Sequence, residues 1–166
     1  AAVRLNPALP ALESWGDLAL GGAATDQQAF VLREGSTAVW VFWRAGADGI
    51  FHVRYDVASN TWSAPVLVPG TDAAGDADTR PCAAIDAEGA IWLFWASERG
   101  ANRDIWLSRR HPVSGAWGEL RQVVAATSTD DFPFALAGQP GVLWLFWQRG
   151  GGAQAELLFK TIVTAV

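Results

Sequence analysis

Three aspartates at equal spacing are the first candidates for chemistry in this 166-residue sequence. Asp26, Asp78 and Asp130 each lie sixteen residues before the Phe of a repeated aromatic pentad, within a short acidic segment. Carboxylates that come close together raise one another's pKa or attract a cation. One interpretation is a rim of equivalent carboxylates that binds a ligand or a metal ion. The other, which is the more common role of Asp in such turns, is that each Asp caps its own turn by accepting hydrogen bonds from backbone N–H groups.

Arginine is the second residue type with a candidate role, because its planar guanidinium group binds anionic and polar ligands through several hydrogen bonds. Arg80 lies in the second acidic segment, and Arg44, Arg99 and Arg149 lie at or after the ends of the pentads. We therefore assign these four arginines, together with the three aspartates, to the predicted ligand-binding rim. No cofactor is expected.

The composition excludes several classes of protein. The net charge is −5 and charged residues make up only 17% of the chain, whereas a general nucleic-acid binder needs a basic face. No run of about 18 apolar residues occurs, so membrane insertion is not expected, and no signal-peptide pattern is visible. Cys82 is the only cysteine, so an intrachain disulfide and a cysteine metal cluster are excluded. The compartment stays open, with the cell surface as one candidate.

An internal repeat must position these residues. The pentads VWVFW (39–43), IWLFW (91–95) and LWLFW (143–147) recur every 52 residues. Short alternating apolar runs, separated by turns rich in Gly and Pro, surround each pentad, which is the pattern of short β-strands. A period near 50 with four strands per unit is typical of a β-propeller blade. The sequence predicts a single all-β domain over 1–166 with blades at approximately 26–70, 78–125 and 130–161.

The aromatic residues of the pentads are predicted to be structural. Side chains of a strand alternate between its two faces, and both faces of an inner propeller strand pack against neighbouring blades. We therefore expect a core between blades formed by Trp40, Phe42, Trp43, Trp92, Phe94, Trp95, Trp144, Phe146 and Trp147.

Two known kinds of blade resemble this repeat. The segment YDVASNTW (55–62) is similar to the turn before the fourth strand of kelch-type blades and to the Asp-box of sialidase-type (BNR) blades. The paired Gly of kelch blades is absent, and Val57 and Pro112 stand where the Asp-box has Asp. The resemblance covers roughly residues 15–161 and implies a propeller of bacterial repeats with a W-x-F-W strand. A sialidase site needs three equivalent arginines and a Tyr–Glu pair, and neither is identifiable here.

The two ends of the repeat are complementary. The segment SWGDLAL (14–20) matches AWGELRQ (116–122), which begins a fourth strand, whereas the third unit has no fourth-strand Trp. We expect the Trp15 segment to supply that strand by strand exchange. Three blades cannot close a ring, because propellers have about four to eight blades. The chain is therefore expected to form a six-bladed homodimer or to belong to a longer protein.

These observations favour a non-catalytic recognition propeller rather than an enzyme. It would bind glycans through loops on one rim and gain avidity from repeated sites. One alternative is a structural or protein-interaction propeller within a larger assembly. A further alternative is a sialidase-like glycoside hydrolase, which would need two carboxylates at catalytic separation.

Overall fold

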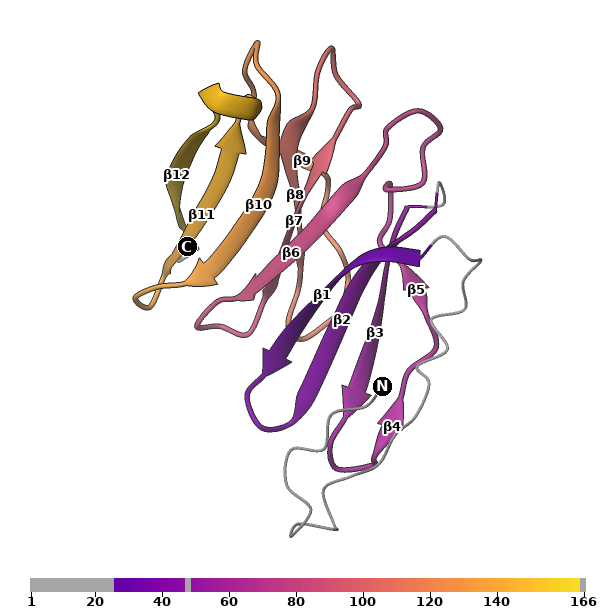
Figure 1. Ribbon diagram of the computed structural model, residues 1–166. Coiled ribbons are helices and arrows are strands. Elements are labelled where there is room, and N and C mark those ends of the chain that lie inside the picture. Colours follow the sequence, from indigo (N-terminus) through magenta and orange to yellow (C-terminus); the bar gives the residue numbers. More distant parts are fainter. Residues whose placement is uncertain (1–25, 47–48, 165–166) are drawn as a thin grey trace, which may run out of the picture.

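The computed structural model of the protein describes residues 26–46 and 49–164, which form three antiparallel sheets (Figure 1). The first sheet contains β1 (Asp26–Glu34), β2 (Ala38–Ala45), β3 (Ile50–Asp56), β4 (Thr61–Trp62) and β5 (Val66–Leu67). The second contains β6 (Thr79–Ile85), β7 (Ile91–Ser97), β8 (Asp104–Arg110) and β9 (Arg121–Val124). The third contains β10 (Asp130–Ala137), β11 (Val142–Arg149) and β12 (Glu156–Val163), with a 3₁₀ turn, η2 (Gly152–Gln154), before β12.

The order of strands within each sheet follows the sequence. The pentads form β2, β7 and β11, each of which is the second strand of its sheet. The second sheet lies between the other two, because β6 contacts both β1 and β10 (Figure 1). The predicted all-β fold is confirmed. No helix of the described residues is long and apolar enough to cross a membrane.

The first strand of each sheet differs from the prediction. The acidic segments were expected to form turns before these strands, but Asp26 and Asp130 are the first residues of β1 and β10, and Asp78 directly precedes β6. Each first strand contains a β-bulge near its start. A bulge leaves one residue out of the ladder and bends the strand, which is why a polar segment belongs to the strand here.

The fourth strands are shorter than predicted. In the first sheet, β4 and β5 both pair with β3, and Trp62 pairs with Tyr55. In the second sheet, Trp117 forms an isolated bridge with Arg110 ahead of β9. The third sheet has three strands among the described residues, and the Trp15 segment lies outside the described part of the chain.

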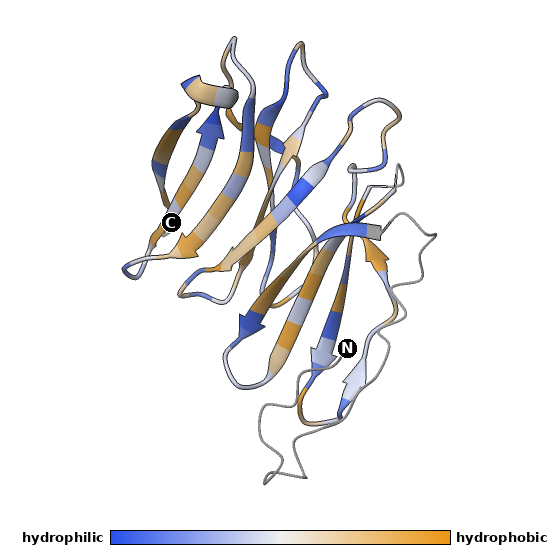
Figure 2. Ribbon diagram, in the orientation of Figure 1, coloured by the Kyte–Doolittle hydropathy of each residue, from blue (hydrophilic) through white to orange (hydrophobic). Residues whose placement is uncertain are grey.

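The pentads supply the core between the sheets through their alternating side chains. Trp40 and Phe42 of β2 pack against Leu93 and Trp95 of β7, and this interface is almost inaccessible to solvent. The opposite face of the second sheet, which includes Phe94, packs against the third sheet. Figure 2 shows hydrophobic residues concentrated along the strands. Burying one such side chain stabilises the fold by roughly 1.5–3 kcal/mol, so the repeated pentads account for much of the stability.

At this third sheet, Leu145 and Trp147 of β11 face the second sheet and are buried. Trp144 and Phe146 point to the opposite face of β11 and are only half-buried. Equivalent pentad residues therefore face the same way in all three sheets, but those on the outer face of the third sheet are less buried.

The first Trp of each pentad has a polar anchor in two of the three sheets. Trp40 Nε1 donates to Glu34 (2.8 Å), and Trp92 Nε1 donates to Asp86 (2.7 Å). Glu34 and Asp86 are 52 residues apart, and Gly138 occupies the equivalent position in the third sheet. A Cβ atom at Gly138 would lie 2.7 Å from the Trp144 ring, so the third sheet lacks both the acid and the space for it.

Candidate functional site

Two of the three aspartates predicted to form a rim are buried within their own sheets. Asp130 accepts hydrogen bonds from Trp147 Nε1 (2.9 Å) and from Arg149 Nε (2.8 Å) and Nη2 (3.0 Å). Asp78 likewise accepts a hydrogen bond from Trp95 Nε1 (2.9 Å). The backbone of Asp26 begins β1, and its side chain lies outside the described part of the structure.

Arg99 pairs with the Asp78 carboxylate, just as Arg149 pairs with that of Asp130. Each of these two aspartates therefore joins the second Trp of a pentad to an arginine that follows it, which is Arg99 in the loop after β7 and Arg149 at the end of β11. This arrangement differs from both interpretations of the sequence, the ligand rim and the capped turn. Within the described ranges, no group of three or more His, Cys, Asp or Glu side chains is arranged to hold a metal ion.

Burial and ion pairing shift the pKa of the Asp78 carboxyl group in opposite directions. Burial raises the pKa of Asp78, although hydrogen bonds from Ser97, Trp95 and Arg99 and the Arg99 charge act against it. The hydrogen bonds to Asp130 raise the pKa of Arg149. Removing one partner of a buried ion pair leaves an uncompensated charge and typically costs about 3–5 kcal/mol. These two pairs therefore act mainly on stability.

The remaining predicted arginines lie in two different places. Arg44 pairs with Gln27 in the ladder between β1 and β2 and lines a cavity of about 380 Å³ whose wall includes Asp78. Arg80 lies at the bulge of β6 and extends to the third sheet, where it binds Asp131. The four arginines thus have different partners: Arg99 binds Asp78, Arg149 binds Asp130 and Arg80 binds Asp131, while Arg44 lines the cavity beside Asp78.

The three bulges place equivalent residues in an uncommon backbone conformation. Gln28, Arg80 and Phe132 have φ values of 57°, 54° and 53°, and each is 52 residues from the next. Positive φ is uncommon outside Gly, and bulges of this kind re-aim side chains beside functional sites. The Arg80 N–H donates to Gln28 Oε1 (2.8 Å), and the Arg80 guanidinium lies 4.2 Å from the centre of the Phe132 ring. The bulges therefore bring together one residue from each sheet.

A chain of ion pairs continues from this cluster. Asp131 accepts hydrogen bonds from Arg80 Nη1 (2.7 and 2.6 Å) and from Arg103 Nη1 (2.8 Å). Arg103 Nη2 pairs with Glu98. The Asp131 side chain is 8% exposed and that of Glu98 is 46% exposed. One guanidinium group thus bridges a buried carboxylate and an accessible one.

The Arg103 guanidinium is held in this position by both carboxylates. Burial lowers its pKa, but hydrogen bonds and charge from Asp131 and Glu98 outweigh that effect and raise it. Arg103 Nε is buried and has no hydrogen-bond partner among the described residues. Glu98, Arg103 and Asn102 line a cavity of about 520 Å³. The arrangement offers a carboxylate and a guanidinium edge to a polar ligand.

The sequence interpretation included only Arg80 of this network. Asp131 directly follows the repeated Asp130, and Arg103 lies in the same loop as Arg99, but neither was singled out. Asp131 bonds the bulge residue Arg80 from a different sheet, so the repeat carries no signal for the contact. The adjacent Asp130 and Asp131 were the one available hint, because successive residues of a strand face opposite sides.

Comparison with known proteins shows a likeness of fold. A scan against protein-family models and a search of curated proteins find no match. A search of solved structures finds the Bacteroides ovatus protein described as xyloglucan PUL GH43B, with a TM-score of 0.57 and 18% identity. The match covers 85% of this chain and 28% of that protein, which is a glycoside hydrolase of a β-propeller family. The fold is propeller-like.

This likeness also corrects the function predicted from sequence. The non-catalytic recognition propeller is contradicted, because the similar structure is a glycoside hydrolase. The prediction weighed the buried aromatic pentads and the repeated Asp positions, neither of which reports on the Glu98–Arg103–Asp131 network. The likeness supports an all-β, propeller-like fold. It does not extend to the specific features of kelch or Asp-box blades.

Proposed function

We propose that this chain is part of a carbohydrate-active propeller and that glycosides bind at the Glu98–Arg103–Asp131 network, with Glu98 and Asp131 acting in cleavage. The observation that carries the proposal is the single guanidinium that bridges these two carboxylates. Glycosidases use two carboxyl groups roughly 5–9.5 Å apart. Two carboxylates held at the two ends of one guanidinium are separated by a distance of this order.

The two carboxylates have different environments, as the two roles in glycoside cleavage require. Asp131 is buried and accepts hydrogen bonds from two arginines, which fix its orientation. Glu98 is accessible from the 520 Å³ cavity and is paired with Arg103 alone. In the proposed mechanism, Glu98 exchanges the proton with the leaving-group oxygen or with water, and Asp131, which lies behind Arg103 and not in the cavity wall, contributes negative charge that favours positive charge on the sugar ring.

Neighbouring groups supply the remaining contacts that a sugar needs. The Arg103 side chain, which is 24% exposed and lines the cavity, offers guanidinium N–H groups to a hydroxyl group. Phe132, which is 53% exposed beside Arg80, offers an apolar surface next to these polar groups. The similar solved structure is a glycoside hydrolase, which supports carbohydrate as the substrate class. This chain spans only 28% of that protein, so the substrate class rests on the site rather than on overall likeness.

The test is hydrolysis of a panel of aryl glycosides and neutral oligosaccharides by the full chain and by Glu98→Gln. Loss of a positioned acid or base lowers the rate by about 10²–10⁴-fold, so we expect at least a 10²-fold decrease. Glu88→Gln, at an exposed turn outside the network, is the matched control and should retain the wild-type rate. Wild-type protein that neither cleaves nor binds any member of the panel would overturn the proposal, as would full activity of Glu98→Gln.

A further inference from the structure

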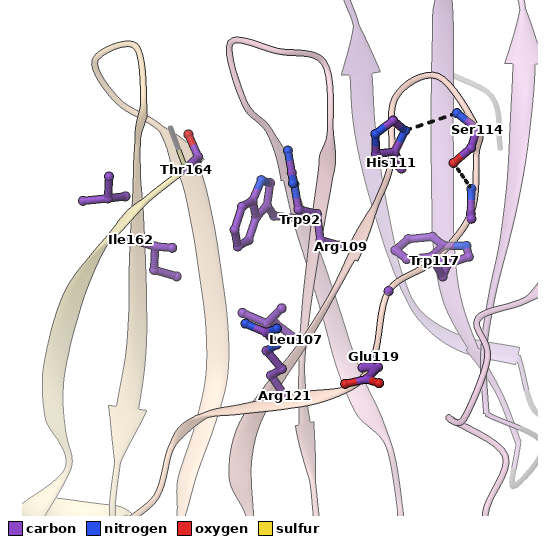
Figure 3. A pocket seen from close by; sticks show the side chains of 13 residues that line it. Trp92, Leu107, Arg109, His111, Ser114, Trp117, Glu119, Arg121, Ile162 and Thr164 are labelled. Atoms are coloured by element: carbon purple, nitrogen blue, oxygen red, sulfur yellow. Dashed lines mark hydrogen bonds between the residues drawn. The ribbon is translucent and has the colours of Figure 1, made fainter. Parts of the chain in front are cut away.

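A large cavity lies between the second and third sheets, at the edge farthest from their first strands. Its volume is about 750 Å³, and its walls include Trp92, Leu107 and Trp117 together with the end of β12. In Figure 3, Trp92 and Leu107 lie between Ile162 on one side and Trp117 on the other. The cavity is therefore bounded by the fourth-strand region of the second sheet and by the last described strand of the third.

The equivalent place between the first and second sheets is filled by Trp117. Its ring lies 6.3 Å from that of Phe42 and 5.6 Å from that of His52, and its Nε1 donates to His52 Nε2 (3.3 Å). Phe42 pairs with His52 in the first sheet, as Phe94 pairs with Leu107 in the second. Leu107, which lines the cavity, is thus the counterpart of His52, the residue against which Trp117 packs.

The strand ladders also identify the edge residue beside the cavity. Trp117 bridges Arg110, and Arg110 pairs with Ile91. In the third sheet the counterpart of Ile91 is Leu143 by the 52-residue period, and Leu143 pairs with Ile162, which lines the cavity. A fourth-strand Trp of the third sheet would therefore lie beside Ile162.

We propose that this cavity is a socket for residues 14–20 of a second copy of the chain, with Trp15 occupying the position that Trp117 occupies between the first two sheets. The segment SWGDLAL matches AWGELRQ (116–122) at Trp, Gly and Leu, with an acidic residue before the Leu. One chain thus carries the sequence for all the strands of three sheets, and its third sheet has an unpaired edge at β12 among the described residues.

A second copy is favoured over the same chain because of reach. Leu20 is six residues before Asp26, which begins β1 in the first sheet, and six residues span at most about 21 Å. The socket lies two sheets away at the fourth-strand position, which corresponds to roughly 25 Å at sheet and strand spacings of about 10 and 4.8 Å. A segment six residues before β1 is therefore too short to reach the socket of its own third sheet, whereas the third sheet of another copy placed beside the first sheet would present a socket within reach.

Exposed apolar residues at the two ends of the chain fit this assembly. Phe134 and Phe159 of the third sheet are 53% and 60% exposed, and Val31 and Trp62 of the first sheet are 63% and 43% exposed. Phe159 pairs with Phe146 as His52 pairs with Phe42, so Phe159 is placed to receive a fourth-strand Trp. Such a patch marks an interaction site.

In a closed ring, the first sheet of the other copy would follow the third sheet. The fourth-strand Trp of that first sheet is Trp62, because it pairs with β3 as Trp117 bridges β8. Trp62 of one copy therefore contacts Phe159 of the other. Two such contacts, related by a two-fold axis, close a ring of six sheets, which lies within the range known for propellers.

Disulfide trapping tests the proposal, because Cys82 is the only cysteine and is buried. Full-length Trp15→Cys and Ile162→Cys proteins are mixed, incubated so that the copies can exchange, and then oxidised, and the products are separated on a non-reducing gel. Residues paired across neighbouring strands lie close enough for a disulfide, so we expect a disulfide-linked dimer from the mixture in at least 10-fold excess over either protein alone. Trp15→Cys mixed with Val113→Cys, at a 90% exposed loop position, is the control.

Three results would overturn the proposal. The first is the absence of the mixed dimer when both variants are folded by circular dichroism. The second is an intrachain disulfide in the double variant Trp15→Cys/Ile162→Cys without any linked dimer, which would place the segment on its own chain. The third is an equal yield with the Val113→Cys control. A folded protein that gives no link would assign the exposed face to further blades of a longer chain.

Discussion

The pH dependence of stability at His52 is a sharp test of the packing between the first two sheets. Burial first, and then the nearby positive charge of Arg110, lower the pKa of His52 from 6.5 to about 4. The buried imidazole is therefore neutral in the folded protein, and its Nε2 accepts the hydrogen bond from Trp117 Nε1. In the unfolded chain the same group binds a proton below about pH 6.5.

The sign and size of the effect follow from this difference. Between pH 6.5 and 4 the unfolded state binds more protons at His52 than the folded state, so stability falls as the pH falls through this window. The shift from 6.5 to about 4 corresponds to roughly 3 kcal/mol at about 1.36 kcal/mol per pKa unit. The full contribution of the neutral imidazole is present above pH 6.5, and it is lost once the pH reaches the folded-state pKa.

Urea unfolding at pH 7.5, 6, 5 and 4 measures this dependence, and His52→Leu provides the comparison. Leucine is a natural choice because Leu107 holds the equivalent position in the second sheet. The variant should be less stable at pH 7.5 by about 1–3 kcal/mol, because Trp117 Nε1 loses its acceptor. The difference between the two proteins should then shrink or reverse towards pH 4. Parallel stability curves for wild type and His52→Leu across the whole range would refute the assignment of a buried neutral histidine.

Two further substitutions test the positions that hold the loops. Asp130→Asn should lower the free energy of unfolding by about 1–3 kcal/mol, because Trp147 and the partly exposed Arg149 lose a buried charged acceptor; chemical denaturation measures it, and a change below about 0.5 kcal/mol would contradict the importance of the pair. Gly49→Ala should lower the melting temperature by several degrees, because φ is +104° and a Cβ atom would lie 2.5 Å from Thr71 O. Gly35→Ala is the control, because φ is also positive there but the surrounding space is open. Equal decreases in melting temperature for the two variants would show that the contact with Thr71 is unimportant.

The repeat made most of the fold predictable. Strands from the pentads alternate in a period of two, and three copies at equal spacing identify equivalent strands without knowledge of their contacts. The bulges were missed because Gln28, Arg80 and Phe132 share a position but not a residue type, so no sequence signal marks them. The roles of Asp78 and Asp130 were missed because they depend on burial against Trp95 and Trp147.

The candidate site was the least predictable part of the molecule. Glu98 and Arg103 come from the loop between β7 and β8, whereas Asp131 comes from β10 of the next sheet. None of these residues is repeated every 52 positions, and their contacts depend on how two sheets pack. Gly138 is a second example of a difference that the repeat does not explain. It stands where the first two sheets have Glu34 and Asp86, so the outer face of the third sheet lacks the acidic side chain that binds the first pentad Trp in those sheets.

The mass of the protein in solution tests the repeat-based account of the assembly most directly. Sedimentation equilibrium of the full chain at tens of micromolar should give twice the chain mass of 17.7 kDa, as expected for two copies that exchange their Trp15 segments. Phe159→Asp, which places a charge at the face proposed to receive Trp62, should shift the protein towards a single chain. A folded wild-type protein of 17.7 kDa, or a dimer that Phe159→Asp leaves intact, would contradict the account.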